Sequence, residues 1–256
     1  MIVAPRDEDL KGSGLFMIRT ATSGTINWCN AAMWEKISGP DGKDWPDGPG
    51  DVALIYLPLA NNNVTVSLGN NNVTVGCLGA GSTKNSQPIY FKDGSISFST
   101  SDDKTSWFRL SGRTGSNSKI VFDVPVAIES DLEIDGMGQP VLNMEFYKDV
   151  NIGTHILCTV RVPSLGAGYT SGNPSGQLQF NADVRGSGTI RHEANATTSL
   201  GSSVKRKSFT GTWDWRSGSH DDNYGAAGLF LGANNSVGYL MVNLMSGVVN
   251  HGTAYR

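Results

Sequence analysis

The chain has 256 residues, of which only 17% are charged and 32 are glycine, and its formal net charge is −3. This charge argues against nucleic acid as a partner, because nucleic-acid binding needs a strongly basic surface. The densest apolar stretch, Val52–Ala60, is interrupted by Pro58 and falls short of the roughly 20 apolar residues of a membrane span. We therefore expect neither nucleic-acid binding nor insertion into a membrane.

The N-terminal residues 1–14 are charged and then glycine-rich, and we interpret them as a flexible arm or an attachment tail. They have neither the basic nor the apolar segment of a standard secretory signal. Strands are predicted at Leu15–Thr22 and Thr25–Trp28. Asn30–Ile37 is the best helix candidate of the chain, about two turns long, because Asn30 can cap it and glycine and proline follow it.

A near-exact tandem repeat follows, with NNNVTVSLG at Asn61–Gly69 and NNNVTVGCLG at Asn70–Gly79. Each copy joins three asparagines, which favour turns, to Val-Thr-Val, which suits a half-buried strand. A unit of about nine residues cannot bury its own apolar face, so it needs stacked neighbours or partner chains. Two copies do not prove a solenoid, but they indicate an extended, β-rich protein.

The rest of the first half reads as short strands separated by turns at intervals of roughly 8 to 12 residues. Lys92–Ser95 contains Asp-Gly, which suits a type I′ turn and predicts a β-hairpin. The strands predicted here are Val52–Leu59, Ile89–Lys92, Ser95–Ser99 and Trp107–Leu110.

Lys119–Gly136 has the most regular pattern of the chain. Apolar residues alternate with polar ones as far as Ile128, and the pattern resumes at Leu132. Strict alternation predicts strands with one buried face. Pro125 falls where a new short strand would begin, a position at which its missing N–H group is tolerated.

This segment, with its DLEIDG turn, resembles the repeats of bacteriophage tail fibres and tail spikes, in which short alternating strands lead from a shaft into a distal domain. The low charge and the abundance of Gly, Ser, Asn and Thr are also similar to that class. Two features depart from it, since the chain has no long heptad or collagen-like region and is short for a complete long fibre. A short tail fibre, a head fibre or a spike fits this length better.

The resemblance implies a homotrimer whose core is buried between chains. It also implies assembly in the host cytoplasm, location in the virion, an N-terminal part bound to other tail or head proteins, and a C-terminal part that meets the host surface. The trimer interface would use the alternating face of the segment, namely Val121, Val124, Ile128, Leu132 and Ile134.

A run of glycines after Asp135 breaks the pattern, and we place a domain boundary near Gly136–Pro140. Residues 15–135 would form a Gly- and Asn-rich attachment and assembly region. Residues 136–256 would form a C-terminal knob, a β-sandwich or barrel-like domain, because long loops join short strands with almost no helix. The strands predicted in the knob are Val141–Tyr147, His155–Val162, Gln177–Val184, Ser208–Trp215, Ala227–Leu231 and Val237–Leu244.

Signatures of metal, cofactor and nucleophile chemistry are weak. The histidines are widely separated, and no two have zinc-ligand spacing. His220–Asn223 offers oxygen ligands but lacks the spacing of a calcium loop. Cys29, Cys77 and Cys158 are odd in number and lack metal-type spacing, so free thiols are expected. We predict no catalytic nucleophile, no metal and no cofactor.

The enzymatic alternative is a polysaccharide-degrading tail spike, whose chemistry needs two carboxylates roughly 5 to 9.5 Å apart. We expect no enzyme, because the sequence shows no long run of the β-helix rungs that such spikes usually have. The carboxylates considered for this chemistry are Asp183, Glu193, Asp214, Asp221 and Asp222.

Ligand binding has better support. In a strand, Trp213 and Trp215 point to one face, and exposed indoles stack on the C–H surfaces of sugars. His220 and Tyr224 follow in a glycine-rich loop, and these four residues form the candidate ligand site. The alternative is that both indoles face the core and pack against Phe209 or Phe230.

We therefore expect an all-β, homotrimeric virion protein whose knob recognises a glycan or a protein on the host surface. A carbohydrate-binding, lectin-like module and a purely structural tail or capsid component stay open as alternatives.

Overall fold

The fold consists almost wholly of short β-strands. It is known from a computed structural model, which describes residues 13–18, 24–57, 63–82, 88–102, 104–112, 118–135, 142–160, 176–192, 197–200, 209–216, 228–231 and 242–246. Within these residues, a single 3₁₀ turn, η2 (Ala31–Met33), accompanies the strands. The predicted all-β class is therefore confirmed.

The strands form two sheets, sheet A with 10 strands and sheet B with 11. Sheet A contains β1 (Leu15–Ile18), β3 (Trp34–Ser38), β4 (Val52–Leu57), β6 (Cys77–Ser82), β8 (Ser106–Gly112), β11 (Leu132–Asp135), β14 (Ile156–Val160), β17 (Thr189–His192), β19 (Thr212–Arg216) and β21 (Val242–Ser246). Sheet B contains β2 (Gly24–Asn27), β5 (Val64–Val75), β7 (Ile89–Phe98), β9 (Ser118–Phe122), β10 (Val126–Ile128), β12 (Leu142–Phe146), β13 (Val150–Asn151), β15 (Gly176–Phe180), β16 (Val184–Arg185), β18 (Thr197–Leu200) and β20 (Gly228–Leu231).

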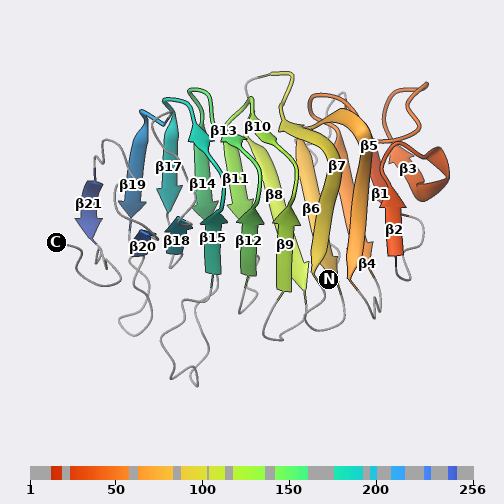
Figure 1. The fold of residues 1–256 in the computed structure, drawn as a ribbon. Coiled ribbons are helices and arrows are strands. Elements are labelled where there is room, and N and C mark those ends of the chain that lie inside the picture. Colours follow the sequence, from red (N-terminus) through yellow and green to blue (C-terminus); the bar gives the residue numbers. More distant parts are fainter. Residues whose placement is uncertain are drawn as a thin grey trace.

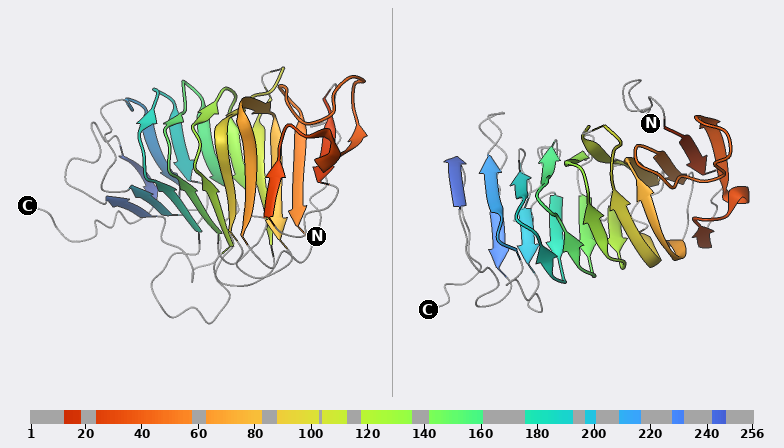
Figure 2. Two further views of the ribbon diagram at one scale, coloured as in Figure 1. Left: turned by 45° about the vertical axis from the view of Figure 1, so that its right-hand side comes forward. Right: turned by 90° about the horizontal axis from the view of Figure 1, so that it is seen from above.

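The chain winds around one axis. Each circuit, which we call a rung, places a strand in sheet A and one or two strands in sheet B before the chain returns to sheet A. Successive sheet A strands pair in parallel, so that Val52 lies beside Cys77 and Cys77 beside Trp107. A tight turn cannot join parallel neighbours, and here the rest of the rung joins them. The fold is a parallel β-solenoid, and its strands follow one another from the N-terminal to the C-terminal end in Figures 1 and 2.

Sheet B bends between two parts, so the rungs that contain β5, β7, β9 with β10, β12 with β13, and β15 with β16 have three faces. Residues 64–67 of β5 pair with 89–92 of β7 before the bend, and residues 71–75 pair with 94–98 after it. β9 then pairs with the first half of β7, and β10 pairs with the second half. We call these two parts the first and second faces of sheet B.

The tandem Asn repeat supplies both faces of one rung. Val64 and Val66 of the first copy are buried on the first face, and Val73 and Val75 of the second copy are buried on the second face. Asn70, at the bend between them, has a φ of 62°, a conformation that Asn tolerates better than most residues. The prediction that Val-Thr-Val of each copy lies in a strand is confirmed, and both segments stack on β7 of the next rung. Asn61 and Asn62 lie outside the described residues.

The hairpin predicted at Lys92–Ser95 is wrong. Asp93 does adopt a positive φ of 60°, as a type I′ turn requires. However, both halves of β7 pair in parallel with β5 instead of pairing with each other. The same backbone conformation therefore makes a solenoid corner, because the neighbouring rung supplies the hydrogen-bond partners.

Phenylalanines stack along the core from rung to rung. Phe91, Phe122, Phe146 and Phe180 share one register position on the first face of sheet B. Their ring centroids are 4.8, 5.3 and 5.2 Å apart, with interplanar angles of 14°, 9° and 13°. Strands in a sheet lie about 4.8 Å apart, so the rung spacing itself brings the rings into stacking contact.

Residues 28–51 cover the N-terminal end of the solenoid. β3 pairs antiparallel with β1 and ends sheet A. The indoles of Trp28 and Trp34 are both buried. The Trp28 indole N–H group donates to the Pro46 carbonyl at 2.7 Å, and the Trp34 indole N–H group donates to the Trp28 carbonyl at 2.6 Å. These bonds satisfy the polar atoms of two large side chains that fill the end of the core.

The helix predicted at Asn30–Ile37 is wrong beyond its first turn. The Asn30 side chain does cap that turn, since it accepts a hydrogen bond from the Ala32 N–H group at 3.0 Å. The turn ends at Met33, and Trp34–Ser38 continues as β3. A helix this short is marginal by itself, whereas the strand binds the open edge of β1 and buries Trp34.

The buried carboxylate of Asp51 ties this N-terminal segment together. It accepts hydrogen bonds from the Gly14 N–H group at 2.9 Å, from the Asp47 N–H group at 3.0 Å and from the Lys43 ammonium at 2.8 Å.

Replacing Asp51 with Asn keeps the shape of the side chain but removes its negative charge. It also replaces one acceptor oxygen with an NH₂ group, which would face the N–H groups and the ammonium that now donate to Asp51. We expect Asp51→Asn to lower the free energy of unfolding by about 2 kcal/mol, measured by urea denaturation. A loss below that of the exposed-site variant Asp102→Asn would contradict this role.

Both sheets continue across the boundary predicted near Gly136–Pro140. β11 pairs with β8 on one side and β14 on the other, and β12 likewise pairs with β9 and β15. Residues 136–141, which lie outside the described part, join β11 to β12 within one rung. The prediction of a separate sandwich or barrel-like knob is therefore wrong for the described strands, which extend the same solenoid.

Candidate functional site

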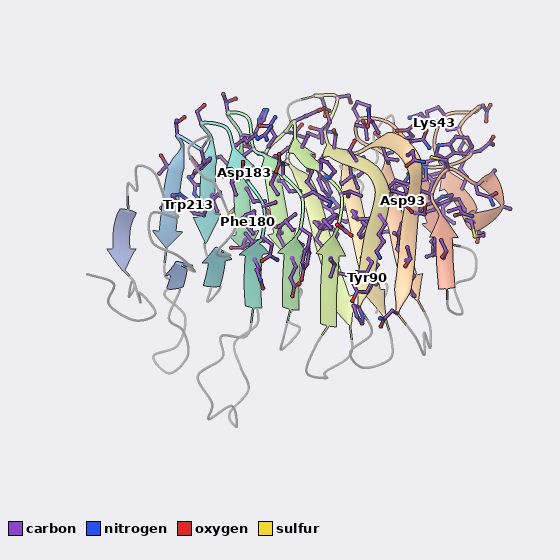
Figure 3. All side chains as sticks on the ribbon, viewed as in Figure 1. Lys43, Tyr90, Asp93, Phe180, Asp183 and Trp213 are labelled. Atoms are coloured by element: carbon purple, nitrogen blue, oxygen red, sulfur yellow. The ribbon has the colours of Figure 1, made fainter. Side chains whose placement is uncertain are left out.

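Trp213 lies in the core and not at a ligand site. Its side chain is 1% exposed, and its ring centroid lies 5.3 Å from Phe209 and 6.4 Å from Phe180 in edge-to-face contacts. Figure 3 labels Trp213 in β19 and Phe180 in β15. The predicted exposed Trp213 is wrong, and the alternative of packing against Phe209 is confirmed for it. The Trp215 side chain, His220 and Tyr224 lie outside the described part of the chain.

The face predicted to join subunits belongs to the core of a single chain. Val124, Ile128, Leu132 and Ile134 are 1% to 3% exposed and pack in the main apolar cluster. Val121 lies on the outward side of β9 but is only 2% exposed. The alternation in this segment is explained by the interior of the solenoid, and these side chains leave no surface for a partner.

Of the carboxylates considered for polysaccharide cleavage, the structure describes Asp183 and Asp214. Asp214 in sheet A accepts a hydrogen bond from the Arg191 Nε at 2.9 Å. Asp183 lies between β15 and β16 of sheet B, so these two residues form no pair. Glu193, Asp221 and Asp222 lie outside the described residues. The expectation that the chain lacks solenoid rungs is wrong.

The outward side of sheet A carries charges in two register rows, one with Arg109 and Asp135 and the other with Arg191 and Asp214. Arg109 is in register with Asp135, and its guanidinium lies 4.2 Å from the centroid of the Trp107 ring. Arg109, Asp135 and Asp214 are only 5%, 0% and 4% exposed. A buried charge is costly without a partner of opposite sign. Because these charged side chains are buried, they offer no open surface to a ligand.

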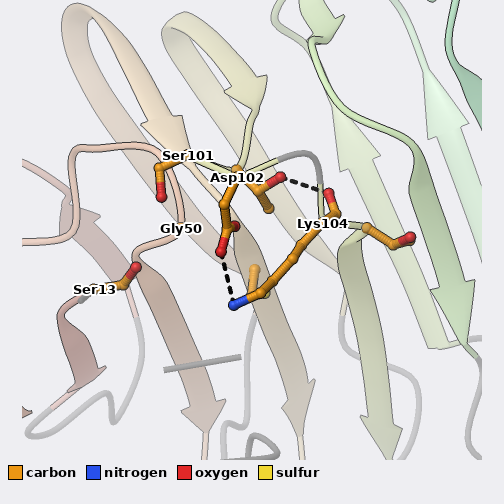
Figure 4. A pocket seen from close by; sticks show the side chains of 8 residues that line it. Ser13, Gly50, Ser101, Asp102 and Lys104 are labelled. Carbon is orange, nitrogen blue, oxygen red and sulfur yellow. Dashed lines mark hydrogen bonds and ion pairs between the residues drawn. The ribbon is translucent and has the colours of Figure 1, made fainter. Parts of the chain in front are cut away.

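A shallow pocket lies at the corner between sheet B and sheet A (Figure 4), with an empty volume of about 310 Å³ that includes space open to solvent. The ammonium of Lys104 lies 2.9 Å from the Asp102 carboxylate, and the Thr100 hydroxyl donates to the Lys104 carbonyl at 2.5 Å. The polar groups therefore bond to one another, and they hold the corner. The lining residues are Ser13, Gly50, Cys77, Thr100, Ser101, Asp102, Lys104 and Thr105.

The first face of sheet B presents a partly open outward surface, on which Tyr147 is 46% exposed while Val121 and Glu145 are 2% and 7% exposed. Because side chains alternate along a strand, the residues on either side of each stacked phenylalanine point outward. They form two rows that cross β7, β9, β12 and β15. One row is Tyr90, Val121, Glu145 and Gln179, the other is Lys92, Asp123, Tyr147 and Asn181, and together they are the tyrosine face.

Polar contacts on the tyrosine face occur both between neighbouring rungs and within single strands. The Lys148 ammonium lies 3.5 Å from the Asp123 carboxylate, and the Gln179 amide donates to the Asn181 side-chain oxygen at 2.8 Å. The Lys92 ammonium lies 5.3 Å from the centroid of the Tyr90 ring, which Figure 3 labels. Tyr147 itself is 46% exposed. An exposed aromatic ring among amide and carboxylate groups is the most ligand-like arrangement in the described part of the chain.

Sequence reasoning missed the tyrosine face, although a signal was present. Each stacked phenylalanine stands between two outward-facing residues, which is a repeated local pattern. Consecutive members of the stack lie 24 to 34 positions apart in the chain, at Phe91, Phe122, Phe146 and Phe180. Such irregular spacing hides the repeat, because the loops between strands differ in length from rung to rung. Only the register between rungs shows that the flanking residues lie side by side.

No cluster of metal-ligating side chains occurs among the described residues. The three cysteines are free, as predicted. Burial raises the pKa of the Cys29 thiol, and the charge of Asp47 adds to the effect, whereas a hydrogen bond from Asn71 lowers it. In the described ranges, no helix is both long and apolar enough to pass through a membrane.

The fold and these surfaces define the chain as a parallel β-solenoid protein, with a partly open polar and aromatic face among its described residues. Comparisons with protein-family models, with curated proteins and with solved structures found no match.

Proposed function

We propose that this chain is a virion structural protein of the tail-fibre, tail-spike or head-fibre type, and that it serves in attachment to the host-cell surface. The observation that carries the proposal is the solenoid, an elongated and continuously hydrogen-bonded body. Such a body holds a binding surface at a fixed distance from its attachment point. The low charge and the resemblance of the DLEIDG segment to tail-fibre repeats support the same class.

In this proposal the N-terminal region binds other tail or head proteins, and the later rungs meet a glycan or protein on the host. The N-terminal end suits an anchoring role because residues 28–51 close it with buried indoles and backbone hydrogen bonds. Weak contacts at the outward faces gain strength when several copies bind together.

The attachment role is tested by the binding of labelled protein to a panel of bacterial strains, together with antibody labelling of purified virions. We expect saturable binding to a subset of strains and the presence of the chain in virions. A chain that binds no strain but occurs in virions supports the purely structural alternative. A chain absent from virions contradicts the proposal.

Self-association as a homotrimer is part of the proposal. We expect light scattering coupled to size exclusion to give a mass near three times 27.2 kDa. The large apolar side chains exposed among the described residues are Ile37 and Tyr147, so contacts through these faces would be mainly polar. A trimer of that kind should dissociate as salt rises. A mass of 27.2 kDa at low salt contradicts the trimer and favours a lectin-like module.

A polysaccharide-degrading spike is the second candidate, and the presence of solenoid rungs favours it. Release of reducing ends or of unsaturated sugars from bacterial polysaccharides would support this candidate. Binding without any release supports an attachment role alone.

A further inference from the structure

We propose that the tyrosine face binds a neutral glycan, with Tyr147 as the ring on which a sugar stacks. This inference rests on the proposed attachment function and names the receptor class and the site. Three observations carry it, namely an exposed aromatic ring, polar groups on the flanking rungs, and the balance of charge.

The ring of Tyr147 is unusual for its exposure. It is 46% exposed, whereas the adjacent Phe146 is 3% exposed and locked in the phenylalanine stack. The backbone N–H of Tyr147 also donates to the Phe122 carbonyl at 2.9 Å. A large amphipathic ring on a rigid support loses little conformational entropy when a ligand covers it.

Hydrogen-bonding groups lie on both rungs that flank this ring. Asp123 occupies the equivalent position on the preceding rung and Asn181 on the following rung. Rungs are about 4.8 Å apart, so a pyranose ring on Tyr147 lies within reach of both side chains. The Asp123 carboxylate oxygens and the Asn181 amide oxygen, which also accepts from Gln179, can accept bonds from sugar hydroxyls. The Asn181 amide nitrogen is buried and does not take part.

The charges of the face favour a neutral ligand over an acidic one. Lys148 lies beside Asp123 at 3.5 Å, and Lys92 lies over the Tyr90 ring at 5.3 Å. Of the two carboxylates on this face, Glu145 is only 7% exposed, so Asp123 is the one that meets solvent. Asp123 balances the charge of Lys148, and Lys92 lies over the Tyr90 ring. The site around Tyr147 therefore has no net positive charge to attract an acidic sugar.

The test measures binding of the full chain to an array of neutral oligosaccharides built from glucose, galactose, mannose and N-acetylglucosamine, and of acidic ones that carry uronic or sialic acid. We expect binding to one or more neutral oligosaccharides. Tyr147→Ala should weaken that binding at least tenfold, because the stacking surface is lost. Tyr147→Phe, which keeps the ring, should stay within about threefold.

Ile37→Ala is the matched control, since Ile37 is 49% exposed at the N-terminal end, away from the tyrosine face. It should bind as the parent chain does, and thermal unfolding confirms that each variant is folded. Binding only to acidic oligosaccharides, no binding at all, or equal binding by Tyr147→Ala would each overturn the inference. If Tyr147→Ala still binds bacterial cells as the parent does, the attachment proposal stands while this site falls.

Discussion

Replacing Phe122 with Ala should lower the free energy of unfolding by about 4 kcal/mol. Phe122 is 1% exposed, and its ring contacts three others, with centroids 4.8 Å from Phe91, 5.9 Å from Phe108 and 5.3 Å from Phe146. Truncation removes the transfer free energy of the ring and leaves a cavity that the rungs cannot close, because backbone hydrogen bonds fix their spacing. Urea denaturation followed by circular dichroism measures the change.

Two further variants test whether the stack is the cause. In Phe122→Leu the leucine side chain fills most of the volume of the ring, so the free energy of unfolding should fall by less than about 1.5 kcal/mol. Tyr147→Ala removes a ring from the surface of the same face and should cost under about 1 kcal/mol. If Phe122→Ala costs no more than Tyr147→Ala, the phenylalanine stack does not stabilise the solenoid core.

Replacing Gly188 with Ala should lower the free energy of unfolding by about 3 to 5 kcal/mol, which is in the range of the most destabilising single substitutions. A Cβ atom there would lie 2.0 Å from the His155 carbonyl oxygen and 2.8 Å from its backbone nitrogen. The rungs must separate locally to admit it. That movement disrupts the bond of 2.9 Å from the Thr189 N–H group to the same carbonyl.

Gly42→Ala is the control for the backbone conformation of glycine. Gly42 has a φ of 84°, and nothing lies within 4 Å of its virtual Cβ. Gly42→Ala should lower the free energy of unfolding by only about 1 to 2 kcal/mol, the strain of placing alanine in a left-handed conformation. Equal losses in the two variants, measured by urea denaturation, would show that close approach between rungs is not what requires glycine at 188.

Several features of the fold could be predicted because they depend on local chemistry. The alternation in Lys119–Gly136 predicts strands with one buried face, and β9, β10 and β11 lie there. Pro125 directly precedes β10, where the missing N–H group of proline is tolerated. Asn30 caps the following turn because its side-chain oxygen accepts a hydrogen bond. The Asn repeat correctly indicates units that need stacked neighbours.

The candidate site could not be predicted, because its residues meet only through register between rungs. Asp123, Tyr147 and Asn181 are far apart in the chain, and each looks like an ordinary polar or aromatic residue in a strand or turn. Trp213 shows the reverse case. Its sequence setting allows both a ligand site and a core position, and in the structure Phe180 and Phe209 pack against it and bury it.

The sequence by itself determined that this protein is all-β, with short strands, polar corners and free thiols, because these properties follow from alternation, turn chemistry and residue counts. Only the tertiary structure decided that the strands pair in parallel between rungs, that Asp93 and Gly94 make a corner and not a hairpin, and that Val124 and Ile128 face the chain's own core. Pairing between distant segments depends on which partners satisfy backbone hydrogen bonds and fill the interior, and a local pattern does not specify those partners.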